Sequence, residues 1–266
     1  MSSEKPTGHE EETRRFRLRD AEQEAAFFLP HLSPGMRLLD AGCGPGSITR
    51  GLANYVAPGD VTGIDSDAAR IETALGILAL EESDNLSYEV ADVTDLPFEN
   101  GQFDAVFANG LIEHLPFPGD GISELMRVLK PGGIIGLRSP DWDVALLHPD
   151  NTDLRDSIAL RNRWQRSRGG HPDAGRMLRG QLKSAGFADV VAGSTADSHG
   201  TDEGVAEGVR YMHSILNDPE LSEFAEANGW ASDVDLDRMR DGWTNWSEQP
   251  DAFASFFWCH AIGRKP

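Results

Sequence analysis

The chain has 266 residues, 39% of them hydrophobic, which suits one α/β domain with an added cap. It carries 44 acidic and 24 basic side chains, and the formal net charge of −20 argues against nucleic acid, whose phosphates such a surface repels. The sequence contains no run of about 18 apolar residues, so no membrane span is expected. The charged segment 1–20 lacks the apolar centre of a secretory signal, which predicts a cytoplasmic protein.

The first half of the chain alternates between helix and strand patterns. A helix is expected over 10–29, where Pro30 ends it. Further helices are expected over 47–56, 67–82 and 122–129. Short apolar runs bounded by turn residues predict strands over 36–40, 61–64, 86–90, 103–108 and 134–138. This alternation predicts a parallel, doubly wound α/β sheet.

The second half is less regular. Helices are expected over 153–166 and 173–185, and a sixth strand over 187–191. The segment 201–248 is rich in helix patterns, and 253–263 returns to a strand pattern.

The most informative segment is the glycine turn, Asp40 to Ser47, which directly follows the first apolar strand. Such a turn places backbone N–H groups and a helix N-terminus at the carboxyl end of a strand, where α/β sheets bind nucleotide-like ligands. A dinucleotide fingerprint, G-x-G-x-x-G, would need a glycine at Ser47, but the third glycine falls one position early, at Gly46.

Residues 40–46 resemble motif I of class I S-adenosylmethionine-dependent methyltransferases, written D/E-x-G-x-G-x-G. The resemblance continues through Asp65, Asp92 and Asn109 to the Pro-Gly-Gly run at 131–133. Over residues 96–133 it is similar to the ubiquinone/menaquinone-biosynthesis branch, whereas the region from Asp141 onward carries no motif of the quinone enzymes. The resemblance implies a Rossmann-like, doubly wound sheet of seven strands, in which an antiparallel seventh strand lies between the fifth and the sixth.

From this resemblance we expect three parts. Residues 1–30 would form an N-terminal helical lid, 31–194 and 251–266 the Rossmann-like core, and 195–250 a helical cap inserted near the C-terminus.

The resemblance also implies S-adenosyl-L-methionine as the cofactor. Asp65 ends the second strand, where a carboxylate can accept both ribose hydroxyls. Asp92 would accept the adenine amino group, and Asn109 would lie beneath the sulfonium. The expected cofactor-binding residues are Asp40, Gly42, Cys43, Gly44, Gly46, Asp65, Ser66, Asp92, Val93 and Asn109.

Structural alternatives stay open for several of these residues. Asp40 would either accept from the ligand's ammonium group or hold the turn together. A strand-end Asp or Asn also serves as a turn residue or a helix cap. Cys43 is expected to be an inert thiol that fits a tight space.

His114 is the candidate general base, because it follows the fourth strand at the edge of the expected donor pocket; the alternative is a packing role. Candidate substrate contacts are Arg138, Trp142, His148, His171 and Arg176, with core packing as the alternative for Trp142. No metal site is predicted.

The expected acceptor is a small, partly apolar molecule of phenolic, quinone-like or isoprenoid type. Segment 109–112 lacks the Asn/Asp-Pro-Pro-aromatic run of enzymes that methylate nucleobase amines, which also disfavours nucleic acid. Two other functions remain open: non-methylating chemistry on the same fold, and a nicotinamide-dependent oxidoreductase. The sequence also leaves open whether the chain forms a homodimer.

Overall fold

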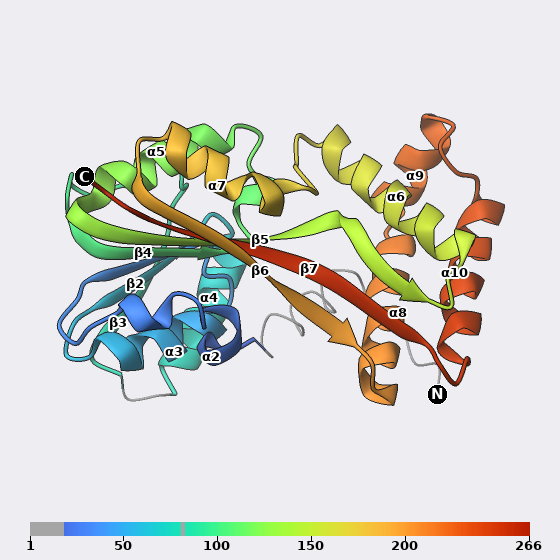
Figure 1. Ribbon diagram of the computed structural model, residues 1–266, viewed down its shortest axis with the longest axis horizontal. Coiled ribbons are helices and arrows are strands. Elements are labelled where there is room, and N and C mark those ends of the chain that lie inside the picture. Colours follow the sequence, from blue (N-terminus) through green and yellow to red (C-terminus); the bar gives the residue numbers. More distant parts are fainter. Residues whose placement is uncertain (1–18, 81–82) are drawn as a thin grey trace. The chain divides into compact units, whose positions relative to one another are not determined.

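The computed structural model describes residues 19–80 and 83–266 (Figure 1). Much of the helix expected over 10–29 therefore lies outside the described residues. Within them, this segment forms a short helix α2 (Ala21–Glu24) and a 3-10 turn η1 (Leu29–His31).

The helix expected to continue to residue 29 ends earlier because two adjacent aromatic side chains turn to the same partner. The rings of Phe27 and Phe28 lie 6.2 and 5.4 Å from the ring of Phe107. Neighbouring residues of an α-helix point about 100° apart, so helical geometry would separate these rings. Tertiary packing thus ends α2 at Glu24.

The strands form one seven-stranded sheet in the order β3-β2-β1-β4-β5-β7-β6. Their bounds are β1 (Leu38–Ala41), β2 (Val61–Asp65), β3 (Leu86–Val90), β4 (Phe103–Asn109), β5 (Leu129–His148), β6 (Ala188–His199) and β7 (Phe253–Arg264). Strand β1 pairs in parallel with β2 and β4, and β7 runs opposite to β5 and β6 (Figure 1). The expected doubly wound sheet, with its seventh strand between the fifth and sixth, is confirmed.

Alternating side chains of the strands build two cores, one on each face of the sheet. Leu38 and Phe107 pack on the side of α2 and α3 (Ser47–Val56). Leu39 and Val106 pack on the other side with α5 (Pro118–Val128) and α7 (Ala174–Ser184). Successive side chains of a strand point to opposite faces, so a strand covered on both sides is apolar throughout.

The helices differ from expectation mainly at their ends. Helix α4 (Ala68–Leu78) begins after its cap Asp67 and ends four residues before the expected position 82. Helix α5 begins at Pro118 rather than at 122, because proline fits the first turn of a helix.

The chain divides into two compact units. The sheet unit comprises the described residues up to Ser139, together with Ala174–Ser194 and Cys259–Pro266. The helical unit comprises Pro140–Asp173 and Thr195–Trp258. Strands β5, β6 and β7 each contribute residues to both units.

These boundaries differ from the expected ones. The segment 140–173, expected in the core, groups with 195–258, and residues 19–30, expected in a lid, belong to the sheet unit. The reason is that helix α6 shares its core with three later helices. Among the described residues of this unit, the helices are α6 (Thr152–Ser167), α8 (Asp202–Leu216), α9 (Pro219–Ala227) and α10 (Asp233–Ser247).

Trp243 of α10 occupies the centre of the helical unit and is completely buried. Its indole N–H donates to the hydroxyl of Ser157 on α6 at 2.8 Å, and its ring meets the Trp246 ring edge to face. A buried indole needs such a partner for its N–H group.

In the part of the chain that the structure describes, we find no helix with the length and apolar character needed to cross a membrane.

We predict that Trp243→Ala lowers the free energy of unfolding by about 3–5 kcal/mol, because it empties the centre of this core. Trp243→Phe is the matched control: it keeps most of the ring and loses the hydrogen bond, at a cost of about 1 kcal/mol. Urea denaturation measures both. Equal small losses would contradict a central packing role for this side chain.

Candidate active site

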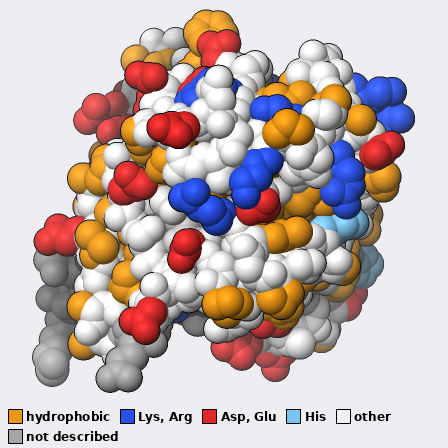
Figure 2. All heavy atoms as spheres, turned by 90° about the vertical axis from the view of Figure 1, so that its left-hand side faces the viewer, with side chains coloured by type: hydrophobic (Ala, Val, Ile, Leu, Met, Phe, Trp, Pro, Cys, Tyr) orange, Lys and Arg blue, Asp and Glu red, His pale blue; other side chains and the backbone are white. Residues whose placement is uncertain are grey.

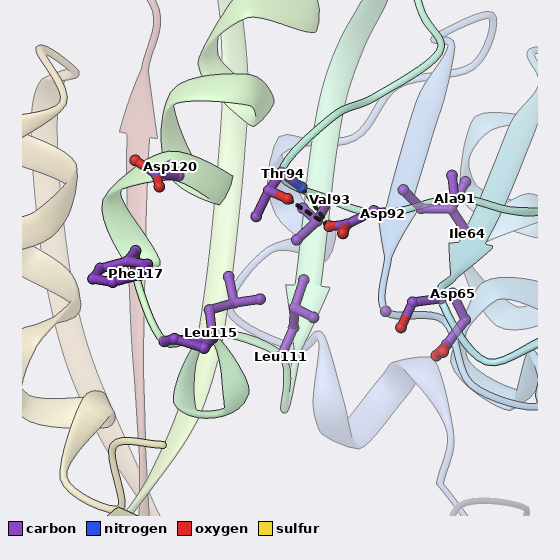
Figure 3. Close-up of a pocket in the computed structure, with 13 residues that line it drawn as sticks. Ile64, Asp65, Ala91, Asp92, Val93, Thr94, Leu111, Leu115, Phe117 and Asp120 are labelled. Atoms are coloured by element: carbon purple, nitrogen blue, oxygen red, sulfur yellow. Dashed lines mark hydrogen bonds between the residues drawn. The ribbon is translucent and has the colours of Figure 1, made fainter. Parts of the chain in front are cut away.

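A cavity of about 370 Å³ lies at the carboxyl ends of the parallel strands in the sheet unit (Figure 3). Asp65 and Ser66 line it after β2, Asp92 and Val93 line it after β3, and Gly42 contributes from the glycine turn. The opposite wall is apolar and follows β4: Leu111, Leu115, Pro116 and Phe117. Strand order reverses between β1 and β4, which is where open α/β sheets bind ligands.

The glycine turn is anchored to the end of β2. The N–H groups of Gly42 and Cys43 both donate to the carbonyl oxygen of Ile64 at 2.8 Å. The N–H of Gly44 donates to Oδ2 of Asp65 at 3.0 Å. These bonds hold the turn against the strand that carries the carboxylate.

Two glycines of the turn are needed for different reasons. A Cβ on Gly44 would meet no described atom within 4 Å, so the space beside it is open. A Cβ on Gly46 would lie 2.3 Å from the hydroxyl oxygen of Tyr88. Both residues have positive φ, +55° and +81°, which disfavours any side chain. Gly44 thus leaves a cradle for a ligand, whereas Gly46 makes room for Tyr88.

Tyr88 of β3 supports the turn from below and was not predicted from the sequence. Its hydroxyl donates to the carbonyl oxygen of Gly46 at 3.2 Å, and its ring occupies the space that a Cβ on Gly63 would need. A tyrosine at the centre of a strand pattern is usually interpreted as a core residue. Its hydrogen bond to a turn 42 residues away forms only in the folded protein, so the sequence pattern does not predict it.

Asp40 is buried beneath the turn and is 2% exposed. Its Oδ2 accepts a hydrogen bond from the Thr49 hydroxyl at 2.7 Å, which ties β1 to α3. Its pKa is raised from 3.8 to about 7, mainly by burial and in smaller part by the charge of Asp65, while the hydrogen bond from Thr49 opposes the rise. Asp40 does not line the cavity. Its hydrogen bond from Thr49 favours the second of the two roles expected for it, which is to hold the turn together.

Cys43 is also buried in this turn. Burial raises the pKa of its thiol far above the ordinary value, and the charges of Asp40 and Asp65 raise it further. The thiol is therefore protonated at neutral pH, as expected for an inert cysteine.

Asp65 is 8% exposed and lines the cavity. In addition to the Gly44 bond, its Oδ1 accepts from the N–H of Asp67 at 2.9 Å. Each carboxylate oxygen has a second lone pair, so this carboxylate can accept from a ligand without losing its own contacts. Backbone anchoring thus fixes an acceptor at the cavity wall.

Asp92 and Val93 form the wall after β3. Oδ1 of Asp92 accepts from both the N–H and the hydroxyl of Thr94 at 2.8 Å, and these bonds lower the pKa of Asp92. Its Oδ2 remains available to a ligand. Val93 is buried beside it, and Figure 3 places Asp92 and Asp65 at the same side of the cavity.

Asn109, the last residue of β4, pairs with Arg138 in the middle of β5. Arg138 donates from Nη1 to Oδ1 of Asn109 at 3.0 Å and forms an ion pair with Glu24 of α2. Neither residue belongs to the lining of the cavity. Arg138, expected to contact substrate, is thus engaged by protein groups.

His114 ends the short 3-10 helix η2 (Ile112–His114) and is 60% exposed in its side chain. It does not line the cavity. Its neighbour Glu113 is buried, and Oε2 of Glu113 accepts from the hydroxyl of Ser139 at 2.8 Å. The structure therefore does not bring His114 into the cavity.

Three candidate substrate residues belong to the helical unit. Trp142 stacks on Tyr211 with ring centres 5.6 Å apart, and the Arg161 guanidinium lies 4.1 Å from its ring centre. Nε2 of His148 lies 3.0 Å from Oδ2 of Asp251 at the surface. His171 is half-buried in the segment after α6. In the sheet unit, Arg176 is exposed on α7.

The sequence analysis named five of the residues that line the cavity and missed the others, among them Phe117 and Asp120. Phe117 is 73% exposed, which is unusual for so large an apolar side chain, and Asp120 lies in the first turn of α5. Both line the cavity after β4. The Pro-Phe-Pro run at 116–118 could have indicated Phe117 as a site residue. Prolines on both sides favour a loop, and loops at the surface often carry functional side chains.

The face of the molecule in Figure 2 carries basic side chains near its middle, with acidic side chains among them. Ion pairs such as Arg127–Glu124 and Lys130–Asp104, each at 2.7 Å, show how opposite charges are matched in the sheet unit.

Comparison with known proteins identifies the family. A model described as "Methyltransferase domain" matches residues 32–171, so the chain belongs to the methyltransferase domain family. It is 29% identical to an uncharacterized methyltransferase of Schizosaccharomyces pombe, over 90% of this chain and 87% of that protein. It is 38% identical to sterol 24-C-methyltransferase ERG6B of Gibberella zeae, over 46% of this chain and 32% of that protein.

The fold is also that of solved methyltransferases. The structure of phosphoethanolamine N-methyltransferase 2 of Haemonchus contortus in complex with S-adenosyl-L-methionine has a TM-score of 0.61 at 20% identity. The similarity covers 98% of this chain and 57% of that one. This chain is a methyltransferase, and its cofactor is S-adenosyl-L-methionine. The open cradle at Gly44 and the anchored Asp65 carboxylate fit that cofactor.

We predict that the stability of the protein falls as pH rises from about 4 to about 7, in part through Asp40. Its folded pKa of about 7 exceeds its ordinary value of 3.8, so the fold favours the protonated form, and this contribution is lost as Asp40 ionises. Asp40→Asn should flatten the dependence of the melting temperature on pH in this window, relative to the parent protein. Parallel profiles would contradict the burial argument.

We predict that two glycine substitutions both destabilise the protein, but that only Gly44→Ala strongly weakens ligand binding. Gly46→Ala should lower the melting temperature, because the new methyl group collides with Tyr88. Gly44→Ala should cost about 1–2 kcal/mol of stability, since left-handed backbone disfavours alanine, while weakening S-adenosylhomocysteine binding by about tenfold or more. Differential scanning fluorimetry and calorimetric titration measure the two effects. A larger stability loss for Gly44→Ala than for Gly46→Ala would contradict these assignments.

Proposed function

We propose that this methyltransferase transfers a methyl group from S-adenosyl-L-methionine to a small, partly apolar acceptor of phenolic, quinone-like or isoprenoid type. The observation that carries the cofactor half of this proposal is the Asp65 carboxylate, held at the cavity wall by the N–H of Gly44. The acceptor half is supported by similarity to a sterol methyltransferase and by the resemblance to the quinone-biosynthesis branch.

In this proposal the cavity residues divide the cofactor among them. Asp65 accepts from the ribose hydroxyls, with Ser66 beside it, while Oδ2 of Asp92 and the N–H of Val93 face the adenine. The glycine turn meets the methionine part, where the open space at Gly44 supports close approach of a ligand to the backbone. The apolar wall after β4, including Phe117, supports the placement of a flat ring in the cavity.

When bound, the cofactor supplies an activated methyl group on a sulfonium. The protein's task is then to position the nucleophile and exclude water, so a general base is optional. His114 remains a proposed base for a phenolic or carbon acceptor; its exposed side chain can reach a ligand only at the surface. Arg138, Trp142, His148, His171 and Arg176 remain proposed substrate contacts.

The charge of the chain supports a small acceptor rather than a nucleic acid. A net charge of −20 disfavours a phosphate backbone, and the face in Figure 2 mixes basic with acidic side chains. We propose that the enzyme is cytoplasmic. Whether it forms a homodimer is left open by this proposal.

Asp65→Asn tests the cofactor half. The amide keeps the shape of the side chain but loses the charge and one acceptor, so we predict that the affinity for S-adenosylhomocysteine falls by about 10- to 100-fold, or 1–3 kcal/mol. Asp67→Asn is the matched control, because Asp67 caps α4 and asparagine caps equally well. Unchanged affinity in Asp65→Asn, measured by calorimetry, would overturn the ribose assignment.

Titration of the unaltered protein tests the function itself. We expect binding of S-adenosylmethionine and S-adenosylhomocysteine and none of NAD, followed by formation of S-adenosylhomocysteine with a phenol, quinol or isoprenoid acceptor. Binding of NAD alone would favour the oxidoreductase. Cofactor binding with no methylated product across a broad acceptor panel would favour non-methylating chemistry.

A further inference from the structure

Asp40 is a buried carboxylate that the proposed cofactor contacts do not use. It is 2% exposed and accepts a hydrogen bond from the Thr49 hydroxyl at 2.7 Å. Two residues later in the chain, Gly42 lines the cavity, as does Asp65 at the end of β2 (Figure 3). Asp40 therefore lies directly behind the cavity wall, where it can act on a ligand through its charge rather than by contact.

Four elements present polar or titratable groups to Asp40. Thr49 of α3 donates a hydrogen bond and so favours the ionised carboxylate. The charge of Asp65, on β2, opposes ionisation. Cys43 in the turn and Tyr88 on β3 stay neutral near pH 7, because burial raises the pKa of both groups and the charge of Asp40 raises it further. The two carboxylates thus carry the negative charge of this cluster.

Among the described residues, no basic side chain belongs to the groups that shift the pKa of Asp40. Arg50 of α3 and Arg70 of α4 lower the pKa of the neighbouring phenol and thiol instead. A buried carboxylate beside a like charge and without a counter-ion favours its protonated form. The pKa of about 7 agrees with this geometry and leaves both forms populated near neutral pH. A positive charge that enters the cavity would therefore promote ionisation of Asp40.

The two forms of the cofactor differ in charge at the reacting atom. S-adenosylmethionine carries a sulfonium, and loss of its methyl group leaves the neutral thioether of S-adenosylhomocysteine. The rest of the two molecules is the same. Unit charges interact over several ångströms where water is excluded, so a sulfonium in the cavity attracts a carboxylate behind the wall. Ionised Asp40 therefore favours the donor over the product, whereas protonated Asp40 does not.

We propose that Asp40 is a specificity-determining residue that discriminates the cationic methyl donor from the product. In this proposal Asp40 releases its proton to solvent when S-adenosylmethionine binds and retains it when S-adenosylhomocysteine binds. Preference for the donor then increases as the pH rises through neutrality, and inhibition by the product decreases. The inference rests on the proposed function, because it requires that the cofactor occupies this cavity.

Counting the protons released on binding tests this proposal directly. Calorimetric titration in phosphate and in Tris, two buffers with different enthalpies of ionisation, gives that number at pH 7. With S-adenosylmethionine, the parent protein should release up to about half a proton more than Asp40→Asn, because about half of the Asp40 side chains are protonated at this pH. With S-adenosylhomocysteine the two proteins should not differ. The amino group of the ligand also titrates, but it contributes equally to both proteins.

The ratio of the two affinities is the second measurement. Between about pH 6 and pH 8, the preference of the parent protein for S-adenosylmethionine over S-adenosylhomocysteine should increase about two- to fivefold more than that of Asp40→Asn. Asparagine still accepts from Thr49 but stays neutral, so this variant represents the protonated state. Asp67→Asn is the matched control, because the N–H of Asp67 binds Asp65 but its side chain is only half-buried. It should behave as the parent protein.

Thr49→Val keeps the acid and removes the hydrogen bond that favours its ionised form. The pH at which the affinity ratio rises should therefore move upward, away from neutrality. This variant tests the proposal even where Asp40→Asn does not fold. An unshifted rise in Thr49→Val would contradict the assignment of the rise to Asp40.

The remaining outcomes are distinct. Equal proton release by the parent protein and Asp40→Asn overturns the role of Asp40. Equal Asp40-dependent release with both ligands overturns the discrimination, because Asp40 would then respond to occupation of the cavity rather than to charge. Failure of the parent protein to bind either ligand overturns the proposed function and this inference with it.

Discussion

The contact on which the site depends is the hydrogen bond from the N–H of Gly44 to the carboxylate of Asp65. It joins the turn after β1 to the end of β2 and fixes the carboxylate at the wall of the cavity. Two further N–H groups of the turn bind the end of β2, and Tyr88 supports the turn from β3. Three neighbouring strands thus hold one short segment, so the backbone is organised for a ligand before the ligand arrives.

Beneath this turn the ionised form of Asp40 is destabilised by burial and by the charge of Asp65. Asp40 is buried, accepts a hydrogen bond from Thr49, and has its pKa raised in part by the charge of Asp65. A buried carboxylate is tolerated because its hydrogen bond links the first strand to the first helix after the turn. The same burial and the same two carboxylates hold the thiol of Cys43 in its protonated form.

On the other side of the reversal in strand order, the polar groups have the opposite character. There Arg138 donates to Asn109 and pairs with Glu24, whereas Asp65 and Asp92 place acceptors at the cavity wall. The family and the fold of the chain are those of methyltransferases, and the fold does not by itself determine the acceptor.

The sequence by itself determined the sheet, because apolar runs, glycine turns and helix periodicity are local properties. It also placed Asp65, Asp92, Val93 and Gly42, which the structure finds in the wall of one cavity, since strand ends can be read from such patterns. The tertiary structure alone decided the rest. Three contacts join residues that are distant in the chain: Tyr88 with Gly46, Glu24 with Arg138, and the rings of Phe27 and Phe28 with Phe107. The last of these contacts ends α2 early, at Glu24. No local pattern records such contacts, because burial and packing are set only when the strands and helices meet.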